Sequence, residues 1–272
     1  MKLSEVYKIA DEIAPKRLSD EYCRTAGAYD NSGLLVEACD EVKGILFTLD
    51  LTNAAIDKAL ECGANLIITH HPVIYGKIDH ICLGDQTLLG EKLIRCIRAG
   101  ISVISMHLNL DVVKGGIDES LMEGVMLAAG DSAGAGMRSI TIQHPVEDSG
   151  YGRVYTVNEV SLGDLAEGMK KIFSTDKILT YGCLDEKITR VASFCGAGVD
   201  EHAILFAKAN GAQVMISSDF KHHLVQLLVE SGMSVIVLTH YASEQYGFEK
   251  FYKKIREKVA IPCVYHTESS LF

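Results

Sequence analysis

Imidazole side chains collect at one point of the sequence where an apolar run stops. The stretch "LIITHHPVIY" (66–75) ends its run of Leu and Ile in the adjacent pair His70 and His71, and Pro72 fixes the next turn. Neighbouring residues of a strand point to opposite faces, but at a strand end the backbone can turn and bring both rings together. Imidazole nitrogen is a ligand for zinc, manganese, iron and nickel. The double histidine therefore indicates a metal site.

Two further pairs combine histidine with a carboxylate four residues later. They are His107 with Asp111, and His240 with Glu244. If a helix begins at each histidine, the two members of a pair share one face. A lone histidine more often caps a helix or bonds a carbonyl. Here, however, a double histidine occurs together with a His/Glu pair in the other half of the chain, and this combination favours a metal-binding role.

The number of donors suggests more than one ion. Three histidines and two carboxylates exceed what one catalytic zinc needs, and they suit two metals about 3.5–4 Å apart that share a bridging carboxylate. The polar residues that follow the predicted strands are Asp50, His70, His71, His107, Asp111, Ser218, Asp219, His222, His223, His240 and Glu244.

Short apolar runs alternate with helical patterns and must position these residues. In the first half, strands are predicted over 44–51, 64–71 and 101–107, and helices over 53–63, 88–100 and 116–130. In the second half, strands are predicted over 190–198, 212–219 and 233–240, and helices over 199–211 and 221–232. Strands that read as continuous apolar runs between helices are typical of parallel sheets covered on both faces.

The two halves can be aligned with each other. "CGANLIITHH" matches "NGAQVMISSD", and "AGISVISMH" matches "SGMSVIVLTH" in the same order. Between them, 134–181 predicts a strand pair, with a hairpin turn at "EDSGYG", and then a helix. We therefore expect an α/β fold of two related lobes, 1–132 and 133–272. Each lobe is expected to be a mainly parallel sheet flanked by helices.

Composition excludes some classes of function. The formal net charge is −10 over 272 residues, which argues against sequence-independent nucleic-acid binding. The sequence has no apolar run of 18 residues and no signal-peptide centre near its start, so we expect a cytoplasmic protein with no membrane span. The eight cysteines include no CxxC pair, and buried free thiols fit them better than disulfides.

Six motifs, in order along nearly the whole chain, resemble one known family. They are "DNSGLLV", "LDLTNAAIDKA", "ITHHPVIY", "SMHLNLD", "SSDFKHH" and "THYASE". The chain is similar to the NGG-one-interacting-factor-three-like family, whose members are also described as dinuclear metal centre proteins or GTP cyclohydrolase I type 2 homologues. The resemblance implies two α/β lobes with a dimetal site in the cleft between them, assembled as a toroidal homohexamer.

The resemblance also implies how the ligands are shared. Glu244 would bridge two divalent ions, His71 and Asp111 would hold one of them, and His70 and His240 would hold the other. The metals are zinc, iron, manganese or nickel. Leu108, Ser218 and Thr239 depart from the usual pattern of the family, which leaves the pocket lining, and so the substrate, open.

Two classes of function remain open. The first is a metal-dependent hydrolase of a small molecule, including a GTP cyclohydrolase-type opening of a purine ring. In that case His107 is the candidate catalytic residue, as general acid or base or as a residue that orients Asp111. The second is a non-enzymatic metal-binding scaffold or regulatory ring protein.

Further polar residues have two readings each. Lys77 and Lys221 would either meet an anionic substrate or stay solvated. Asp30 and Asn31 would either read a base edge or form a turn. The glycine-rich segment 194–201 would either cradle an anion or make a tight turn.

Overall fold

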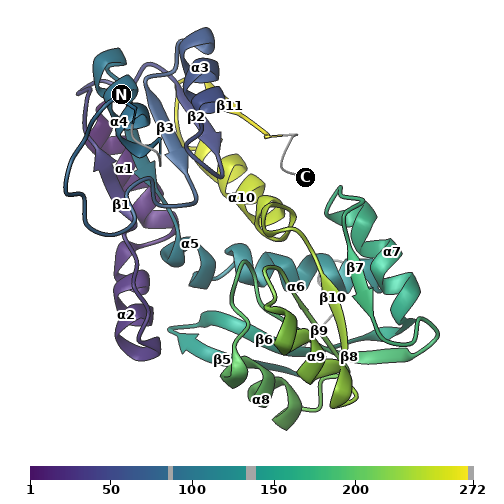
Figure 1. Ribbon diagram of the computed structural model, residues 1–272. Coiled ribbons are helices and arrows are strands. Elements are labelled where there is room, and N and C mark those ends of the chain that lie inside the picture. The colour runs from purple at the N-terminus through teal and green to yellow at the C-terminus, as the bar shows by residue number, and fades with distance from the viewer. Residues whose placement is uncertain (85–87, 133–138, 269–272) are drawn as a thin grey trace. The chain divides into compact units, whose positions relative to one another are not determined.

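Two separate β-sheets, each accompanied by helices, organise the chain. The computed structural model describes residues 1–84, 88–132 and 139–268. The two sheets have five and six strands and belong to two compact units (Figure 1). The first unit is Met1–Val113 with the described chain from Phe248 onward, and the second is Lys114–Gly247. The expected α/β class with two helix-flanked sheets is confirmed.

The first unit contains most of the N-terminal half of the chain. Its helices are α1 (Leu3–Ile13), α2 (Lys16–Ala26), α3 (Asn53–Cys62), α4 (Leu89–Ala99) and α5 (Leu108–Val112). Its strands are β1 (Gly33–Val36), β2 (Ile45–Thr48), β3 (Leu66–Thr69), β4 (Ser102–Ser105) and β11 (Cys263–Tyr265).

The sheet of the first unit has the order β1-β4-β3-β2-β11. All its neighbouring strands pair in parallel except β1, which runs antiparallel to β4. Every residue of β2, β3 and β4 is buried, as continuous apolar runs predict for strands covered on both faces. Apolar residues of α3 and α4, such as Ile56 and Leu93, join these strands in one core cluster. The expectation of a mainly parallel sheet is confirmed for this unit.

The second unit contains the remaining elements. Its helices are α6 (Ile117–Ala128), α7 (Leu162–Ile172), α8 (Glu201–Ala209) and α9 (His222–Glu230), and the boundary with the first unit falls inside α10 (His240–Arg256). Its strands are β5 (Ile140–Val146), β6 (Ser149–Ser161), β7 (Leu179–Tyr181), β8 (Lys187–Ser193), β9 (Val214–Ser217) and β10 (Ser234–Val237).

The sheet of the second unit is mixed, and this corrects the expectation of a mainly parallel one. Its order is β5-β6-β8-β9-β10-β7, and only β8, β9 and β10 run parallel to one another. The hairpin β5–β6 adds antiparallel ladders on one side, and β7 pairs antiparallel with β10 on the other. The predicted hairpin turn is present at Glu147 and Asp148, because Val146 pairs with Ser149. A short hairpin can only join antiparallel strands, so this segment cannot extend the parallel ladder.

The two sheets repeat one topology, as the aligned sequence blocks indicate. The order β1-β4-β3-β2 in the first unit corresponds to β7-β10-β9-β8 in the second. In both, the first strand of the series is antiparallel and the other three are parallel. The lobes are therefore related in strand order and direction as well as in sequence.

The unit boundaries differ from the division at 132/133 expected from sequence. Strand β11, yellow in Figure 1, pairs in parallel with β2, so the end of the chain returns to the first sheet. Helix α6 packs against α7 and β6 and therefore belongs with the second sheet. No local pattern in residues 248–268 indicates which sheet the strand joins, because pairing partners are set by tertiary contacts.

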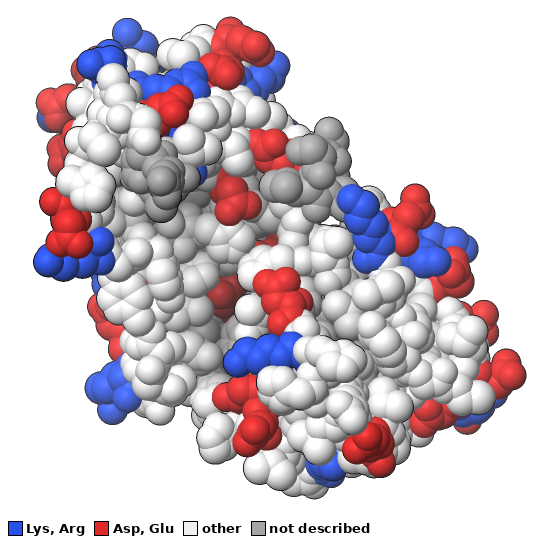
Figure 2. Space-filling model, in the orientation of Figure 1, with Lys and Arg blue, Asp and Glu red and all other residues white. Residues whose placement is uncertain are grey.

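Local signals fix the ends of several elements. The side chain of Thr52 caps α3 by accepting a hydrogen bond from the Ala55 amide, and Gly63 ends the helix in the left-handed conformation. Within the described ranges, no helix combines the length and apolar character needed to cross a lipid bilayer. On the face drawn in Figure 2, the described acidic and basic side chains are interspersed and form no continuous basic surface.

A buried ion pair ties α6 to the second sheet. The Arg153 guanidinium of β6 donates to the Asp118 carboxylate of α6, and both side chains are almost completely inaccessible to solvent. Asp118 also accepts from the backbone amides of Gly152 and Cys195, and Arg153 also donates to Ser149. Loss of one partner leaves the other buried without its nearest counter-charge, although Arg153 also lies 3.8 Å from the carboxylate of Glu119.

We predict that Asp118→Ala lowers the free energy of unfolding by about 3–5 kcal/mol, because Arg153 then remains buried without its carboxylate. Urea unfolding followed by circular dichroism measures the change. The matched control is Glu167→Ala, which removes an exposed ion pair with Lys170 and should change the free energy by less than about 1 kcal/mol. Equal losses in the two variants would contradict a stabilising role for the buried pair.

Candidate metal centre

Three histidines of the first unit come together at the carboxyl edge of its parallel strands. His70 and His71 follow β3, and His107 follows β4. The ring centroid of His70 lies 4.8 Å from that of His71 and 5.1 Å from that of His107. Each of the three residues offers one ring nitrogen, and these atoms lie within 4.8 Å of one another. The clustering of strand-end histidines expected from sequence is therefore confirmed within this unit.

Each of these imidazoles is held through its Nδ1 atom. His70 Nδ1 lies 2.8 Å from the backbone oxygen of Met106, His71 Nδ1 lies 2.8 Å from Asp50 Oδ1, and His107 Nδ1 lies 2.8 Å from Asp30 Oδ1. Carbonyl and carboxylate oxygens accept hydrogen bonds, so Nδ1 carries the proton in each ring. The lone pair of the neutral ring then lies on Nε2, and that atom can bind a cation.

Asp111 lies close to the same imidazoles. It belongs to α5, which begins directly after His107, and it is 4% exposed. Its Oδ1 atom lies 3.5 Å from His70 Nε2. The first unit therefore places a buried carboxylate beside His70.

Asp30 is the most constrained of the supporting acids. Its side chain is 2% exposed, and the hydroxyls of Ser19 and Ser32 each donate to its Oδ2 at 2.5 Å. Burial by itself would raise the pKa of Asp30, but the hydrogen bond and charge of His107, with the two serine hydroxyls, outweigh it and lower the pKa well below its usual range. Asp30 is therefore ionised and committed to His107, which removes it as a reader of a base edge.

The second unit contributes a histidine and a glutamate on one helix. His240 and Glu244 lie one turn apart at the start of α10, and His240 Nε2 is 3.0 Å from Glu244 Oε1. His240 Nδ1 lies 2.6 Å from Asp219 Oδ2, so this ring has the same arrangement as those of the first unit. The predicted shared helix face of this pair is confirmed.

Gly196 makes room for the buried carboxylate of Glu244. Its φ of +57° suits glycine, and a Cβ atom there would lie 2.5 Å from Glu244 Oε1. The backbone amide of Gly196 donates a hydrogen bond to Ser243 Oγ at 3.2 Å. The glycine-rich segment thus serves as a tight turn against Glu244.

The sequence indicated the histidines as a group but did not indicate the acids that bond to their Nδ1 atoms. Asp50 and Asp219 were visible as residues at strand ends, and Asp30 only as half of a turn-forming pair. Their position in the sheet was the available signal. Each histidine follows one strand, and the acid that bonds to it lies next to the end of the neighbouring strand. Lys77 pairs with Asp79 at 2.7 Å, and Lys221 lines a shallow pocket of about 280 Å³ with His202 and His223.

The donor set fits divalent transition metals. Imidazole nitrogens with fixed tautomers and buried carboxylate oxygens are ligands for zinc, iron, manganese and nickel. Acids that accept a hydrogen bond from the far ring nitrogen raise the basicity of metal-binding histidines and fix their orientation. The residues of each unit therefore have the chemistry and the supporting contacts of metal ligands.

Comparison with known proteins agrees with the motifs. A family model described as Duf34/NIF3 (NGG1p interacting factor 3) matches residues 1–269. A Clostridium perfringens protein named GTP cyclohydrolase 1 type 2 homolog is 32% identical over 262 residues, which cover 95% of this chain and 93% of that protein.

Solved structures share the fold. The crystal structure of a Staphylococcus aureus hypothetical protein superposes with a TM-score of 0.80 at 24% identity, covering 98% of this chain and 96% of that one. Reduced HcgD from Methanocaldococcus jannaschii gives a TM-score of 0.77 at 26% identity, covering 97% of each chain. The resemblance inferred from sequence is confirmed, and the chain belongs to the Duf34/NIF3 (NGG1p interacting factor 3) family.

Proposed function

We propose that this chain is a metal-dependent hydrolase of a small molecule that uses two divalent ions held by ligands from both units. The proposed ligands are His70, His71, Asp111, His240 and Glu244, with Glu244 as the bridge. The sequence motifs and the family resemblance support a centre shared by the two units. The metal can be zinc, iron, manganese or nickel.

One observation carries this proposal. All four imidazoles, three in the first unit and one in the second, have Nδ1 bonded to an oxygen acceptor, and in three of them the acceptor is a carboxylate. A structural histidine can also bond a backbone carbonyl, as His70 does, so the carboxylates at His71, His107 and His240 carry the argument. The repeated pattern supports rings prepared to bind cations through Nε2.

The reaction class follows from the chemistry of the ligands. Two bound divalent ions would supply Lewis acidity that activates water towards an electrophilic carbon or phosphorus. The chain itself orients the ligands through Asp50 and Asp219. His107 would act through Nε2, because Asp30 holds its Nδ1 atom. His107 is thus the proposed general acid or base.

The name of the Clostridium perfringens relative suggests a more specific reaction. A GTP cyclohydrolase-type activity would be a hydrolytic opening of a purine ring. We propose this as the first substrate class to test, within a panel that also contains phosphoesters and cyclic amides. Hydrolysis of any member by the metal-loaded protein separates the enzyme from a metal-binding scaffold.

Metal content tests the shared centre. We predict about two divalent ions per chain in wild-type protein loaded with zinc, manganese, iron or nickel and then dialysed. His71→Ala in the first unit and Glu244→Gln in the second should each lower the metal content and any activity in the hydrolase panel, because each removes a proposed ligand. Plasma mass spectrometry measures the ions.

The control for this experiment is His223→Ala, which removes an exposed histidine of α9 outside the proposed ligand set. It should keep both metal and activity. Equal hydrolase activity in wild type and Glu244→Gln would eliminate the dimetal mechanism. Metal loss in only one of the two ligand variants would eliminate the sharing of ions between units.

A second prediction concerns Asp50, which is not one of the proposed metal ligands. Asp50→Asn should weaken metal binding about 10–100-fold, because an amide neither carries the charge nor holds His71 in the same tautomer. Competition with a chromogenic chelator measures the affinity. Asp79→Asn, at an exposed pair with Lys77, is the matched control and should leave the affinity unchanged. A fall of equal size in both variants would contradict the orienting role of Asp50.

The family resemblance also predicts a homohexamer. Sedimentation equilibrium of wild-type protein should give six times the chain mass of 29.6 kDa, and the mass should not depend on concentration in the micromolar range. A monomer or dimer under these conditions would contradict the predicted assembly.

A further inference from the structure

Two tyrosines with largely exposed rings lie beside the imidazoles of the first unit. Tyr29 is 54% exposed and Tyr75 is 61% exposed. The ring of Tyr75 lies 6.4 Å from that of His107, which is itself 5.1 Å from His70 (centroid to centroid). Tyr75 therefore stands one ring away from the candidate metal ligands. None of the roles given so far to the site uses either tyrosine.

The ring of Tyr75 is fixed although it is exposed. Its hydroxyl donates to the backbone oxygen of Tyr29 at 3.1 Å, and the two rings meet edge to face at 5.2 Å and 84°. The loop that carries Tyr75 is itself held, because Asn31 Nδ2 donates to the backbone oxygen of Ile74 at 2.7 Å. An exposed side chain normally keeps its rotamer freedom, so these contacts pre-order a surface that a ligand would otherwise have to order on binding.

The ring orientations select a planar partner. Tyr75 is inclined by 84° to Tyr29 and by 89° to His107. The plane of a ring stacked parallel on Tyr75 would therefore be inclined at nearly right angles to the rings of Tyr29 and His107. Offset stacking and edge-to-face contact are the two arrangements that aromatic rings prefer. A ring stacked on Tyr75 would thus have the tilt that edge-to-face contact with Tyr29 or His107 requires.

We propose that Tyr75, fixed by Tyr29, is a stacking platform that binds a planar aromatic heterocycle, such as a nucleobase, beside the metal centre. This inference rests on the proposed function, since it names the substrate class of the same site. An aliphatic substrate would gain nothing from a fixed π face, whereas a base stacked on an aromatic side chain loses about 5- to 100-fold in affinity when that side chain is truncated.

The test uses 2-aminopurine riboside as a fluorescent probe. The chain contains no tryptophan, so the emission of the probe is measured without tryptophan background. Wild type should bind the probe saturably, guanosine should displace it, and ribose, which lacks the aromatic ring, should not. Tyr75→Ala should weaken binding about 5- to 100-fold.

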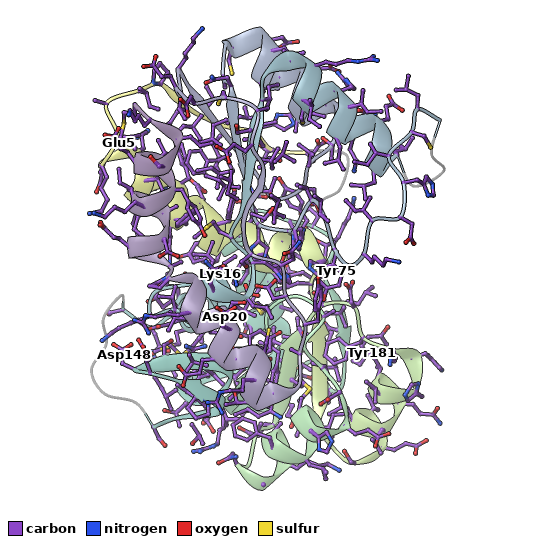
Figure 3. The ribbon with its side chains drawn as sticks, turned by 90° about the vertical axis from the view of Figure 1, so that its left-hand side faces the viewer. Glu5, Lys16, Asp20, Tyr75, Asp148 and Tyr181 are labelled. Atoms are coloured by element: carbon purple, nitrogen blue, oxygen red, sulfur yellow. The ribbon has the colours of Figure 1, made fainter. Side chains whose placement is uncertain are left out.

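Three further variants separate stacking from other causes. Tyr75→Phe keeps the ring and should bind close to wild type, whereas Tyr75→Leu keeps apolar area without a π face and should bind like Tyr75→Ala. Tyr181→Ala removes another exposed tyrosine, 40% exposed and in the second unit, and should change nothing. Tyr75 and Tyr181 are both labelled in Figure 3.

Several results would overturn the platform. One is that the wild type shows no saturable binding of the probe. Others are that ribose displaces the probe as well as guanosine does, or that Tyr75→Ala binds the probe with wild-type affinity. A change of sedimentation mass in Tyr75→Ala would assign the ring to a contact between copies of the chain and would also overturn it.

Metal content measured on the same preparations separates this inference from the proposed function. Metal bound at the wild-type level in Tyr75→Ala, with probe affinity lost, supports the platform. Metal-loaded wild type that does not bind the probe overturns the platform alone. Tyr75-dependent probe binding in a protein that takes up no metal supports the platform and overturns the metal-dependent mechanism alone.

Discussion

The candidate centre depends on one interaction, the hydrogen bond from histidine Nδ1 to a fixed oxygen. This bond decides which nitrogen carries the proton and therefore which nitrogen can bind a cation. It occurs at His70, His71, His107 and His240, with acceptors supplied by a backbone carbonyl or by a carboxylate. Without it, each ring could rotate or change tautomer, and Nε2 would not be fixed as the cation-binding atom.

The sheet makes that interaction possible. Parallel strands bring their carboxyl ends to the same edge, so residues far apart in sequence become neighbours there. Asp50 after β2 reaches His71 after β3 in the first unit, and Asp219 after β9 reaches His240 after β10 in the second. The repeated strand order thus provides the same kind of acid–histidine pair in each unit.

Much of this arrangement was predictable from sequence, and the rest was not for physical reasons. Apolar runs located the central strands, and the residues after them located the histidines. The partner of His107 was invisible to spacing, because Asp30 lies 77 residues away and meets it only through the tertiary fold. The same holds for β11, which joins the first sheet from the far end of the chain, and for the buried pair of Asp118 and Arg153.

The proposed hydrolase and the stacking platform both rest on side chains held in one orientation. The imidazole rings are held for binding metal, and the Tyr75 ring is held for binding an aromatic ligand.

The most direct measurement is an anomalous diffraction map from a crystal grown with manganese or zinc. The account predicts two peaks about 3.5–4 Å apart, contacted by Nε2 of His70, His71 and His240 and by the carboxylates of Asp111 and Glu244. An absence of peaks, or ions bound away from these atoms, would contradict it.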